Sequence, residues 1–201
     1  ALAALNCDDI MLAAYGNPDL YELSASWSDP TDVQWGTDAG SEYYNQHDTE
    51  KAKELLKEAG YNNEKIVLVT TQDYPEMYNA TLVVQEQLKQ AGINAEVETY
   101  DFSTFMEHRS NPQQFDMFIT SNSYNMLPIQ LSVLDSGWAG LNSSEVSKGI
   151  QAIRSAASDE EAAAAWEKLQ KFLYEYSAAT VLGHYTGVTA MSNDVDRKSV
   201  V

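Results

Sequence analysis

The sequence predicts an α/β fold with a mixed open sheet and flanking helices. Two segments of the 201-residue chain, 56–61 and 88–93, repeat the pattern Leu-Lys-x-Ala-Gly followed by Tyr or Ile. In each copy the glycine stands where a helix ends in a left-handed residue, and the residue after it can contact the leucine. A β-branched run, 66–70, follows the first copy, and an alternating apolar–polar run, 93–100, follows the second. Alternating helices and strands of this kind are typical of a sheet with crossover helices.

The first half of the chain contains start and stop signals for three helices. Residues 1 to about 15 are predicted to form one amphipathic helix that ends at Gly16. Asp48 is the predicted N-cap of the helix that ends at Gly60. Pro75 begins the helix that ends in the second repeat. We expect the two helices that end in the repeats to cover the sheet.

The segment 16–47 is predicted to be a long irregular loop within the same unit. It contains prolines, glycines and acidic residues at the frequencies of a loop. Loops of this length in compact domains are usually functional or wrap around another element.

The second half is predicted to contain a short helix, a strand, a loop, two capped helices and two terminal strands. The short helix contains Phe102–Met106, the strand covers 115–120 and the loop covers 121–140. The two capped helices begin at Asn142 and Ser158, and the two terminal strands lie near 180–185 and 187–191. The segment that starts at Ser158 has the pattern of a capping box, with Glu161 three residues later.

Composition excludes several classes of protein. A formal net charge of −18 without a basic cluster argues against a nucleic-acid partner. No apolar run approaches the length of a membrane-spanning helix. The single cysteine, Cys7, excludes an internal disulfide and a cysteine-rich zinc site.

Metal and catalytic motifs are not found in the sequence, so we expect neither an enzyme nor a cofactor. His47, His108 and His184 are far apart and lack the spacing of paired metal ligands, which favours surface or core positions. The acidic residues of 29–42 lack the spacing of a calcium loop. The nucleophile, dinucleotide and phosphate-loop motifs of common enzymes do not occur.

Four segments resemble the extracytoplasmic solute-binding proteins of ABC transporters, family 5, the peptide, nickel and oligosaccharide class. They are 4–10, 48–61, 87–97 and 115–119. Asp48-Thr49 stands where that family usually has Asn-Pro. The resemblance implies that residues 1–201 form a single α/β lobe, the second lobe of a larger two-lobed protein with a periplasmic-binding-protein fold.

The resemblance also implies a function. It predicts the substrate-binding component of a bacterial ABC importer, which captures an extracytoplasmic solute, most readily a peptide, by closing two lobes around it. The implied partners are the solute, the first lobe of the same protein and the permease subunits. The implied location is the periplasm, or the outer face of the cytoplasmic membrane for a lipid-anchored protein. Two alternatives stay open: a soluble α/β enzyme without a recognised motif, and a sensor ectodomain that reuses the binding fold.

Candidate ligand contacts follow from the rule that ligands bind at the carboxyl ends of strands in open α/β sheets. In the family, contacts of this lobe come from the same loops. These positions are Gln72, Asp73 and Tyr74 after the first strand, Asp101 and Phe102 after the second, and Ser121, Asn122, Tyr124 and Asn125 after the third. Trp138 is a further candidate for a ligand or lobe contact, because aromatic residues in loops readily serve binding.

The charges of these loops predict a ligand type. Dipeptide-binding members of the family hold the ligand carboxylate with an arginine in the first loop and the ammonium with an aspartate in the third. Here 70–75 contains no Arg or Lys, and 120–130 contains no Asp or Glu. A free dipeptide is therefore disfavoured, because an unpaired buried charge is costly. A wall of neutral and negative groups suits amides, hydroxyls or a cationic group.

A single lobe provides one wall of a cleft, and a ligand needs the opposite wall to bury most of its surface. We therefore expect the chain alone to fold but to bind solutes weakly. Calorimetry on the purified chain is the measurement, and submicromolar affinity for any solute would contradict the expectation.

Overall fold

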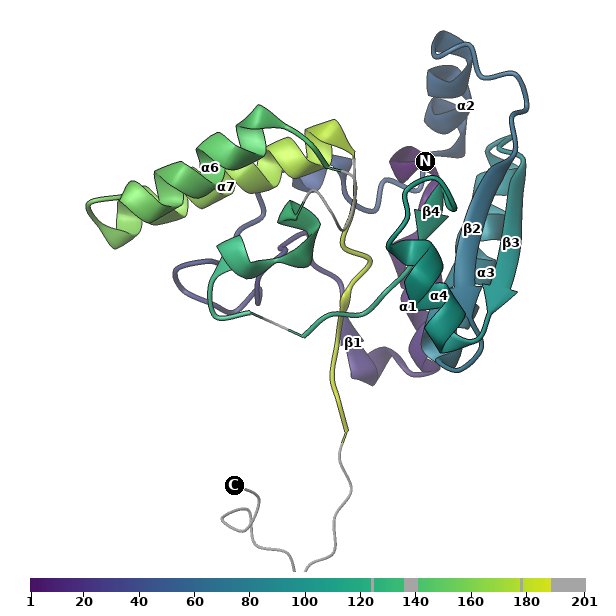
Figure 1. The fold of residues 1–201 in the computed structure, drawn as a ribbon, viewed down its shortest axis with the longest axis horizontal. Coiled ribbons are helices and arrows are strands. Elements are labelled where there is room, and N and C mark those ends of the chain that lie inside the picture. The colour runs from purple at the N-terminus through teal and green to yellow at the C-terminus, as the bar shows by residue number, and fades with distance from the viewer. Residues whose placement is uncertain (124, 136–140, 178, 189–201) are drawn as a thin grey trace, which may run out of the picture.

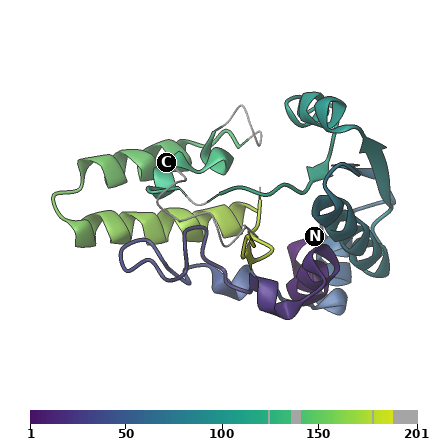
Figure 2. The ribbon, with the colours of Figure 1, turned by 90° about the horizontal axis from the view of Figure 1, so that it is seen from below.

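The computed structural model describes residues 1–123, 125–135, 141–177 and 179–188. The chain is arranged in two halves, a sheet half and a helical half, joined by extended segments (Figure 1). The view from below shows the same separation (Figure 2). Each half has a hydrophobic core of its own.

A parallel sheet forms the centre of the first half, in agreement with the predicted α/β fold. Its strands are β2 (Ile66–Thr71), β3 (Ala95–Tyr100) and β4 (Met117–Phe118), in the order β3-β2-β4. β2 pairs with β3 along its whole length, and Leu68 and Val69 pair with the two residues of β4. The antiparallel pairing expected of a mixed sheet occurs in a separate two-stranded ladder.

β4 is shorter than the strand predicted over 115–120. Its approach to β2 begins at Asp116, whose backbone N–H donates to the Val67 carbonyl at 3.0 Å. The Asp116 carboxylate in turn accepts from the Val67 N–H at 2.7 Å. A side chain thus replaces the backbone as acceptor at this edge, and the regular ladder is restricted to two residues.

Helices cover both faces of β2, and its side chains alternate between them as expected for a strand. Leu68 belongs to the core formed with α1 (Cys7–Tyr15) and α3 (Pro75–Gln90). Val69 belongs to the cluster formed with Phe105 of α4 (Phe102–Arg109). All four residues from Leu68 to Thr71 are buried.

The two repeated stop signals form the predicted helix ends. Gly60 follows α2 (Thr49–Glu58) and has φ of +72°, and Gly92 follows α3 and has φ of +89°. In each, the N–H of the next residue donates to the leucine carbonyl, at 3.0 Å for Leu56 and 2.9 Å for Leu88. These bonds define a Schellman motif. The predicted starts at Asp48 and Pro75 are also confirmed.

The expectation that α2 covers the sheet is wrong. α2 lies beyond the end of the sheet (Figure 1) and packs on the short 3-10 helix η1 (Leu2–Ala4). Ala52 is the buried residue of α2, and it joins a cluster of small residues with Ala3, Ala4 and Ala91. The place beside α3 is occupied by α1 instead.

The single helix predicted over residues 1–15 is interrupted. η1 ends before Leu5, which has an extended backbone, and α1 begins after Asn6. The Asn6 side chain caps α1 by accepting from the N–H groups of Asp8 and Asp9. Gly16 ends α1 in a left-handed conformation, as predicted.

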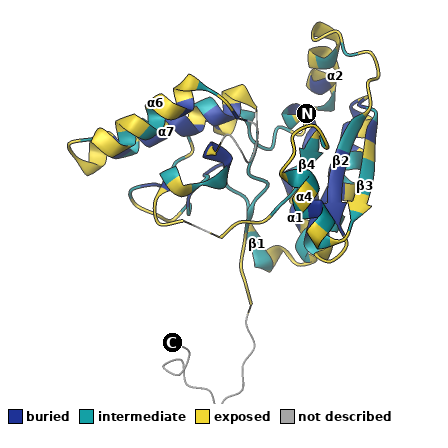
Figure 3. Ribbon diagram, in the orientation of Figure 1, coloured by how far each residue is buried: buried dark blue, intermediate teal, exposed yellow. Residues whose placement is uncertain are grey.

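The helical half is built around a hairpin of α6 (Ser144–Ser155) and α7 (Asp159–Tyr176). Trp166 of α7 is fully buried in its core, and its indole N–H donates to the Trp35 carbonyl at 3.0 Å. Gln170, also buried, donates to the carbonyls of Thr37 and Ala39. The part of the segment 16–47 between residues 25 and 42 thus packs against α7, whose buried residues are visible in Figure 3.

Short elements complete this half and the segments that join it to the sheet. They are η2 (Pro18–Leu20), β1 (Tyr21–Glu22), η3 (Ser41–Tyr43), η4 (Pro128–Gln130), η5 (Ser132–Leu134) and β5 (His184–Tyr185). β1 and β5 form the antiparallel ladder, in which Tyr21 pairs with Tyr185.

Three sequence predictions for this half need correction. The N-cap of α6 is Ser143 rather than Asn142, because the Ser143 hydroxyl accepts from Glu145 N–H. Ser158 caps α7 as predicted, because its hydroxyl accepts from the Glu161 N–H. The Glu161 carboxylate, however, accepts from the Ala157 N–H and not from the N–H of the cap residue. Of the predicted terminal strands, the first is reduced to β5. Residues 187 and 188 are not in a strand, and 189–191 lie outside the described residues.

Across the described ranges, no helix combines the length and apolar character needed to cross a membrane.

The left-handed glycine at the end of α3 predicts an effect on stability. Gly92→Ala should lower the free energy of unfolding by about 1 kcal/mol, because an L-residue in the left-handed region is strained. No atom lies close enough to clash with the added methyl group, so the effect isolates the backbone. Gly187 also has open space around it but no positive φ, which makes Gly187→Ala the matched control. Urea denaturation is the measurement, and equal stability of both variants would contradict the account.

Candidate functional site

The carboxyl ends of β2 and β3 lie at one edge of the sheet because the two strands are parallel. There the structure brings together two of the three predicted groups of site residues. The Asp73 carboxylate accepts a hydrogen bond from the Phe102 N–H at 2.7 Å. The rings of Tyr74 and Phe102 have centroids 4.7 Å apart. We name Gln72, Asp73, Tyr74, Asp101 and Phe102 the strand-end wall.

The two carboxylates of the strand-end wall stabilise the start of α4. Asp101 is its N-cap and accepts from the Thr104 N–H at 3.1 Å and from the Thr104 hydroxyl at 2.7 Å. These bonds hold the pKa of Asp101 below its usual value. Asp73 binds the first N–H group of the same helix. Both side chains therefore have structural roles that their position after a strand did not reveal.

The strand-end wall still presents a binding surface. Gln72, Asp73, Tyr74 and Asp101 are exposed, and Phe102 is half-buried. Tyr74 retains 41% of its accessible surface. An amide, two carboxylates and an aromatic face can contact a solute here.

The third group of predicted site residues, those after the third strand, does not belong to the strand-end wall. Ser121, Asn122 and Asn125 are exposed. They lie on the segment that leaves β4 and runs from the sheet half toward the helical half (Figure 1). The predicted contacts Tyr124 and Trp138 lie outside the described residues.

Arg109 is a candidate site residue that sequence reasoning missed. It ends α4, and its guanidinium donates to the Thr120 hydroxyl at 2.9 Å, directly before Ser121. The predicted loops themselves contain no Arg or Lys, but α4 brings the guanidinium of Arg109 to the start of the third loop. The available signal was that Arg109 is the one Lys or Arg between Lys89 and Lys148. Its position beside Thr120 depends on the packing of α4.

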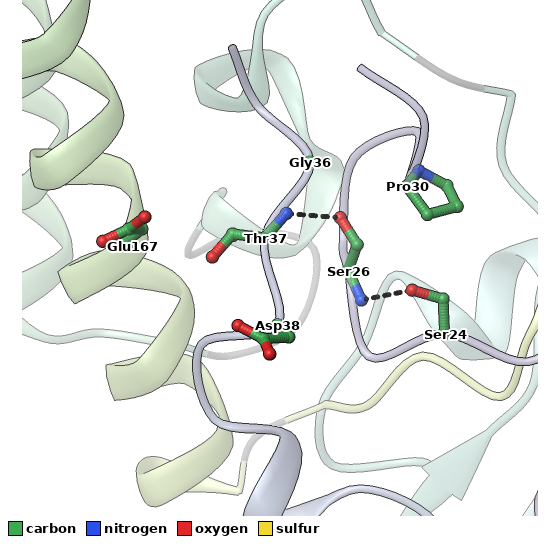
Figure 4. A pocket seen from close by; sticks show the side chains of 7 residues that line it. All are labelled: Ser24, Ser26, Pro30, Gly36, Thr37, Asp38 and Glu167. Carbon is green, nitrogen blue, oxygen red and sulfur yellow. Dashed lines mark hydrogen bonds between the residues drawn. The ribbon is translucent and has the colours of Figure 1, made fainter. Parts of the chain in front are cut away.

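Two hollows in the described parts of the chain are lined without any predicted site residue. The first has a volume of about 370 Å³ and lies where the segment 16–47 meets α7. Figure 4 shows Glu167 on the helix and Asp38 on the neighbouring segment among its lining residues, with the Ser26 hydroxyl accepting from the Thr37 N–H. The second, of about 480 Å³, lies between Trp35, Ile129 and Ile153.

The strand-end wall is thus an open surface in this chain. A solute held there would be buried only by a second wall facing the first. Within the ranges that the structure describes, no group of three or more His, Cys, Asp or Glu could hold a metal ion.

Comparison with known proteins identifies relatives of the chain. Residues 2–137 match the family described as bacterial extracellular solute-binding proteins, family 5 Middle. A probable peptide ABC transporter periplasmic-binding protein of Sinorhizobium fredii, y4tO, is 35% identical over 119 residues, which are 57% of this chain. The chain spans only 22% of the length of that protein.

Solved structures show the same fold. The substrate-binding protein CtaP from Listeria monocytogenes superposes with a TM-score of 0.79 at 21% identity, over 92% of this chain and 39% of that one. The oligopeptide-binding protein AppA from Bacillus subtilis, solved with a nonapeptide, superposes with a TM-score of 0.74 at 21% identity, over 92% and 40%.

The capping role of Asp101 predicts a pH effect at the start of α4. A folded-state pKa below 3.8 means that the ionised cap stabilises the helix above the unfolded-state pKa. This stabilisation is lost as the pH falls through the lowered value. In Asp101→Asn the cap is retained without a titrating group.

Amide NMR on the folded chain is the measurement for this effect. The Thr104 signal should titrate with a midpoint below 3.8 in the unmodified chain and show no such step in Asp101→Asn. A midpoint at or above 3.8, or the same step in the variant, would contradict the assignment.

Proposed function

Because this chain belongs to the bacterial extracellular solute-binding proteins, family 5, we propose that it is one lobe of the solute-capturing component of an ABC importer. The observation that carries the proposal is the strand-end wall, an exposed surface at the carboxyl edge of a parallel sheet. Open α/β sheets bind ligands at this edge. The residues 1–201 would supply one wall of a cleft, and the first lobe would supply the other.

A peptide is the solute that this surface suits best. The Gln72 side chain can donate to and accept from peptide groups, and so can Asn122 and Asn125 on the segment after β4. Tyr74 offers an aromatic face for an apolar side chain. Support also comes from the relatives, because y4tO is named as a peptide-binding protein and AppA was solved with a nonapeptide.

The relatives also support a role without chemistry. The family and the similar proteins are solute-binding proteins of transport systems. In the proposal the protein is not an enzyme and works outside the cytoplasmic membrane, either in the periplasm or attached by a lipid. Its further partners are the permease subunits, which would receive the solute when the lobes open.

Binding by the full-length protein that contains this chain tests the proposal. Alanine peptides of increasing length are titrated in a calorimeter, and saturable binding of at least one length is expected. Tyr74→Ala should weaken that binding by about tenfold, the loss expected of an aromatic contact at the centre of an interface. Tyr176→Ala is the matched control, because Tyr176 is also exposed but lies on α7 in the helical half.

Two outcomes would contradict the proposal. One is that no peptide of the series binds. The other is that Tyr74→Ala and Tyr176→Ala weaken binding equally, since the effect would then not come from the strand-end wall.

A further inference from the structure

Met126 exposes its thioether to solvent. It retains 89% of its accessible surface. The other methionines that the structure describes are buried or half-buried, and they are Met11, Met77, Met106 and Met117. Met106 and Met117 pack against hydrophobic clusters of the sheet half. Among the described methionines, Met126 is therefore the one that a small solute in water reaches most easily.

The backbone directly after Met126 is fixed by a turn. The Leu127 N–H donates to the Gln130 side-chain oxygen at 3.1 Å, and the Gln130 N–H donates to the Leu127 carbonyl at 3.0 Å. The turn contains Pro128, which is buried and begins η4. No hydrophobic cluster of the described chain includes Met126. Its exposure is thus a consequence of where this turn holds the chain.

The one cysteine of the chain is protected from oxidants. Cys7 is 1% exposed, and burial raises the pKa of its thiol to about 11. The thiolate is the reactive form of cysteine, and a thiol with a raised pKa forms little of it near neutral pH. A thioether has no proton to lose, so its reactivity depends on access and not on a pKa. Oxidation of sulfur in the described chain is therefore directed to Met126.

Met126 also lies next to the candidate site. It directly follows Asn125, a predicted contact after the third strand, and directly precedes Leu127, which lines the second hollow. The segment that carries these residues runs from the sheet half to the helical half (Figure 1). A thioether is flexible and polarizable, and it adapts to apolar groups of different shape. A solute bound at Asn125 would cover Met126 as well.

We propose that Met126 is an oxidation site at which a hydroperoxide converts the thioether to a sulfoxide, and that this modification weakens solute capture. A lone pair of the sulfur attacks the terminal hydroxyl oxygen of the hydroperoxide, so that an S–O bond forms and the O–O bond breaks. The leaving oxygen takes the proton of the transferred hydroxyl and departs as water, or as an alcohol from an organic hydroperoxide. The sulfur loses two electrons and the peroxide gains them.

The sulfoxide changes the surface from apolar to polar at this point. Its oxygen accepts hydrogen bonds from water, and covering it with an apolar group of a solute removes those bonds at a cost in free energy. This second part of the inference rests on the proposed function, because it requires a solute that covers the segment. The oxidation itself depends on exposure alone.

Peptide mapping by mass spectrometry measures the oxidation in the full-length protein that contains this chain. During treatment with hydrogen peroxide, Met126 should gain one oxygen more than about tenfold faster than Met11 or Met77, because a buried thioether reacts only in opened states. Saturation with an alanine peptide that binds should slow the reaction at Met126 by about threefold or more, because the covered thioether reacts only from the free protein.

Calorimetry with the same peptide measures the effect on capture. The peroxide-treated protein should bind about fivefold more weakly than the untreated protein, as expected when a polar group replaces an apolar one at a contact. In Met126→Leu, which has no thioether at this position, the same treatment should change the affinity by less than about twofold. Each protein is compared with itself before and after treatment, so a general change in stability affects both values alike.

A matched variant and a repair reaction complete the experiment. Met106→Leu removes a half-buried methionine of α4, and it should keep the full loss on treatment. Methionine sulfoxide reductases convert the sulfoxide back to the thioether, so they should restore the affinity of the treated protein.

The outcomes separate this inference from the proposed function. Oxidation of Met126 no faster than that of Met11 and Met77 overturns the oxidation site. An unchanged affinity after Met126 is oxidised, no slowing by bound peptide, or an equal loss in Met126→Leu overturns the effect on capture. All of these leave the proposed function intact, because the untreated protein binds. If no peptide binds the untreated protein, the proposed function and the effect on capture fail together, and mass spectrometry still decides the oxidation site.

Discussion

The pairing of β2 with β3 on one side and β4 on the other is the constraint on which the rest of the sheet half depends. All three strands are parallel, so β2 and β3 must each be followed by a connection that returns the chain to the edge of the sheet where the strands begin. α3 and α4 are these connections, and they cover the two faces of β2. The same constraint puts the residues after β2 and β3 at one edge. The proposed site is therefore a consequence of strand direction.

Hydrogen bonds at the start of α4 connect the fold to the site. Asp73 and Asp101, which come from two different strand ends, both accept bonds from N–H groups at that helix terminus. Negative charge is favourable there because the helix dipole is positive at its N-terminus. The same helix ends in Arg109, which contacts Thr120 after β4. One short helix thus contacts the ends of β2 and β3 through its first turn and the segment after β4 through its last residue.

Local signals in the sequence were sufficient for much of the fold. The glycines at 60 and 92 predicted both helix ends, and Asp48 and Pro75 predicted two helix starts, because these conformations depend on neighbouring residues. The break before α1 was missed, although Asn6 is a strong N-cap residue and was a local signal for a helix start. Around it, the His47 N–H donates to the Leu5 carbonyl, a contact between residues far apart in the chain.

The candidate site, like the fold, could be predicted from the sequence only in part. That Asp73 and Phe102 share an edge followed from the alternation of helices and strands. The packing of α4 determines that Asp73 binds the backbone of Phe102 and that Arg109 lies beside Thr120. The sequence pattern does not encode this packing. The packing of 16–47 around α7 depends on buried bonds from Gln170 to a distant segment.

The most direct test of the central claim is hydrogen–deuterium exchange on the full-length protein, with and without a bound alanine peptide. If a solute contacts this lobe along the strand ends, amide exchange should slow in 72–74, 101–109 and 119–123. The hollow between the segment 16–47 and α7 supplies the internal comparison. Slower exchange confined to 24–38 and to α7 around Glu167, with no change at the strand ends, would contradict the account.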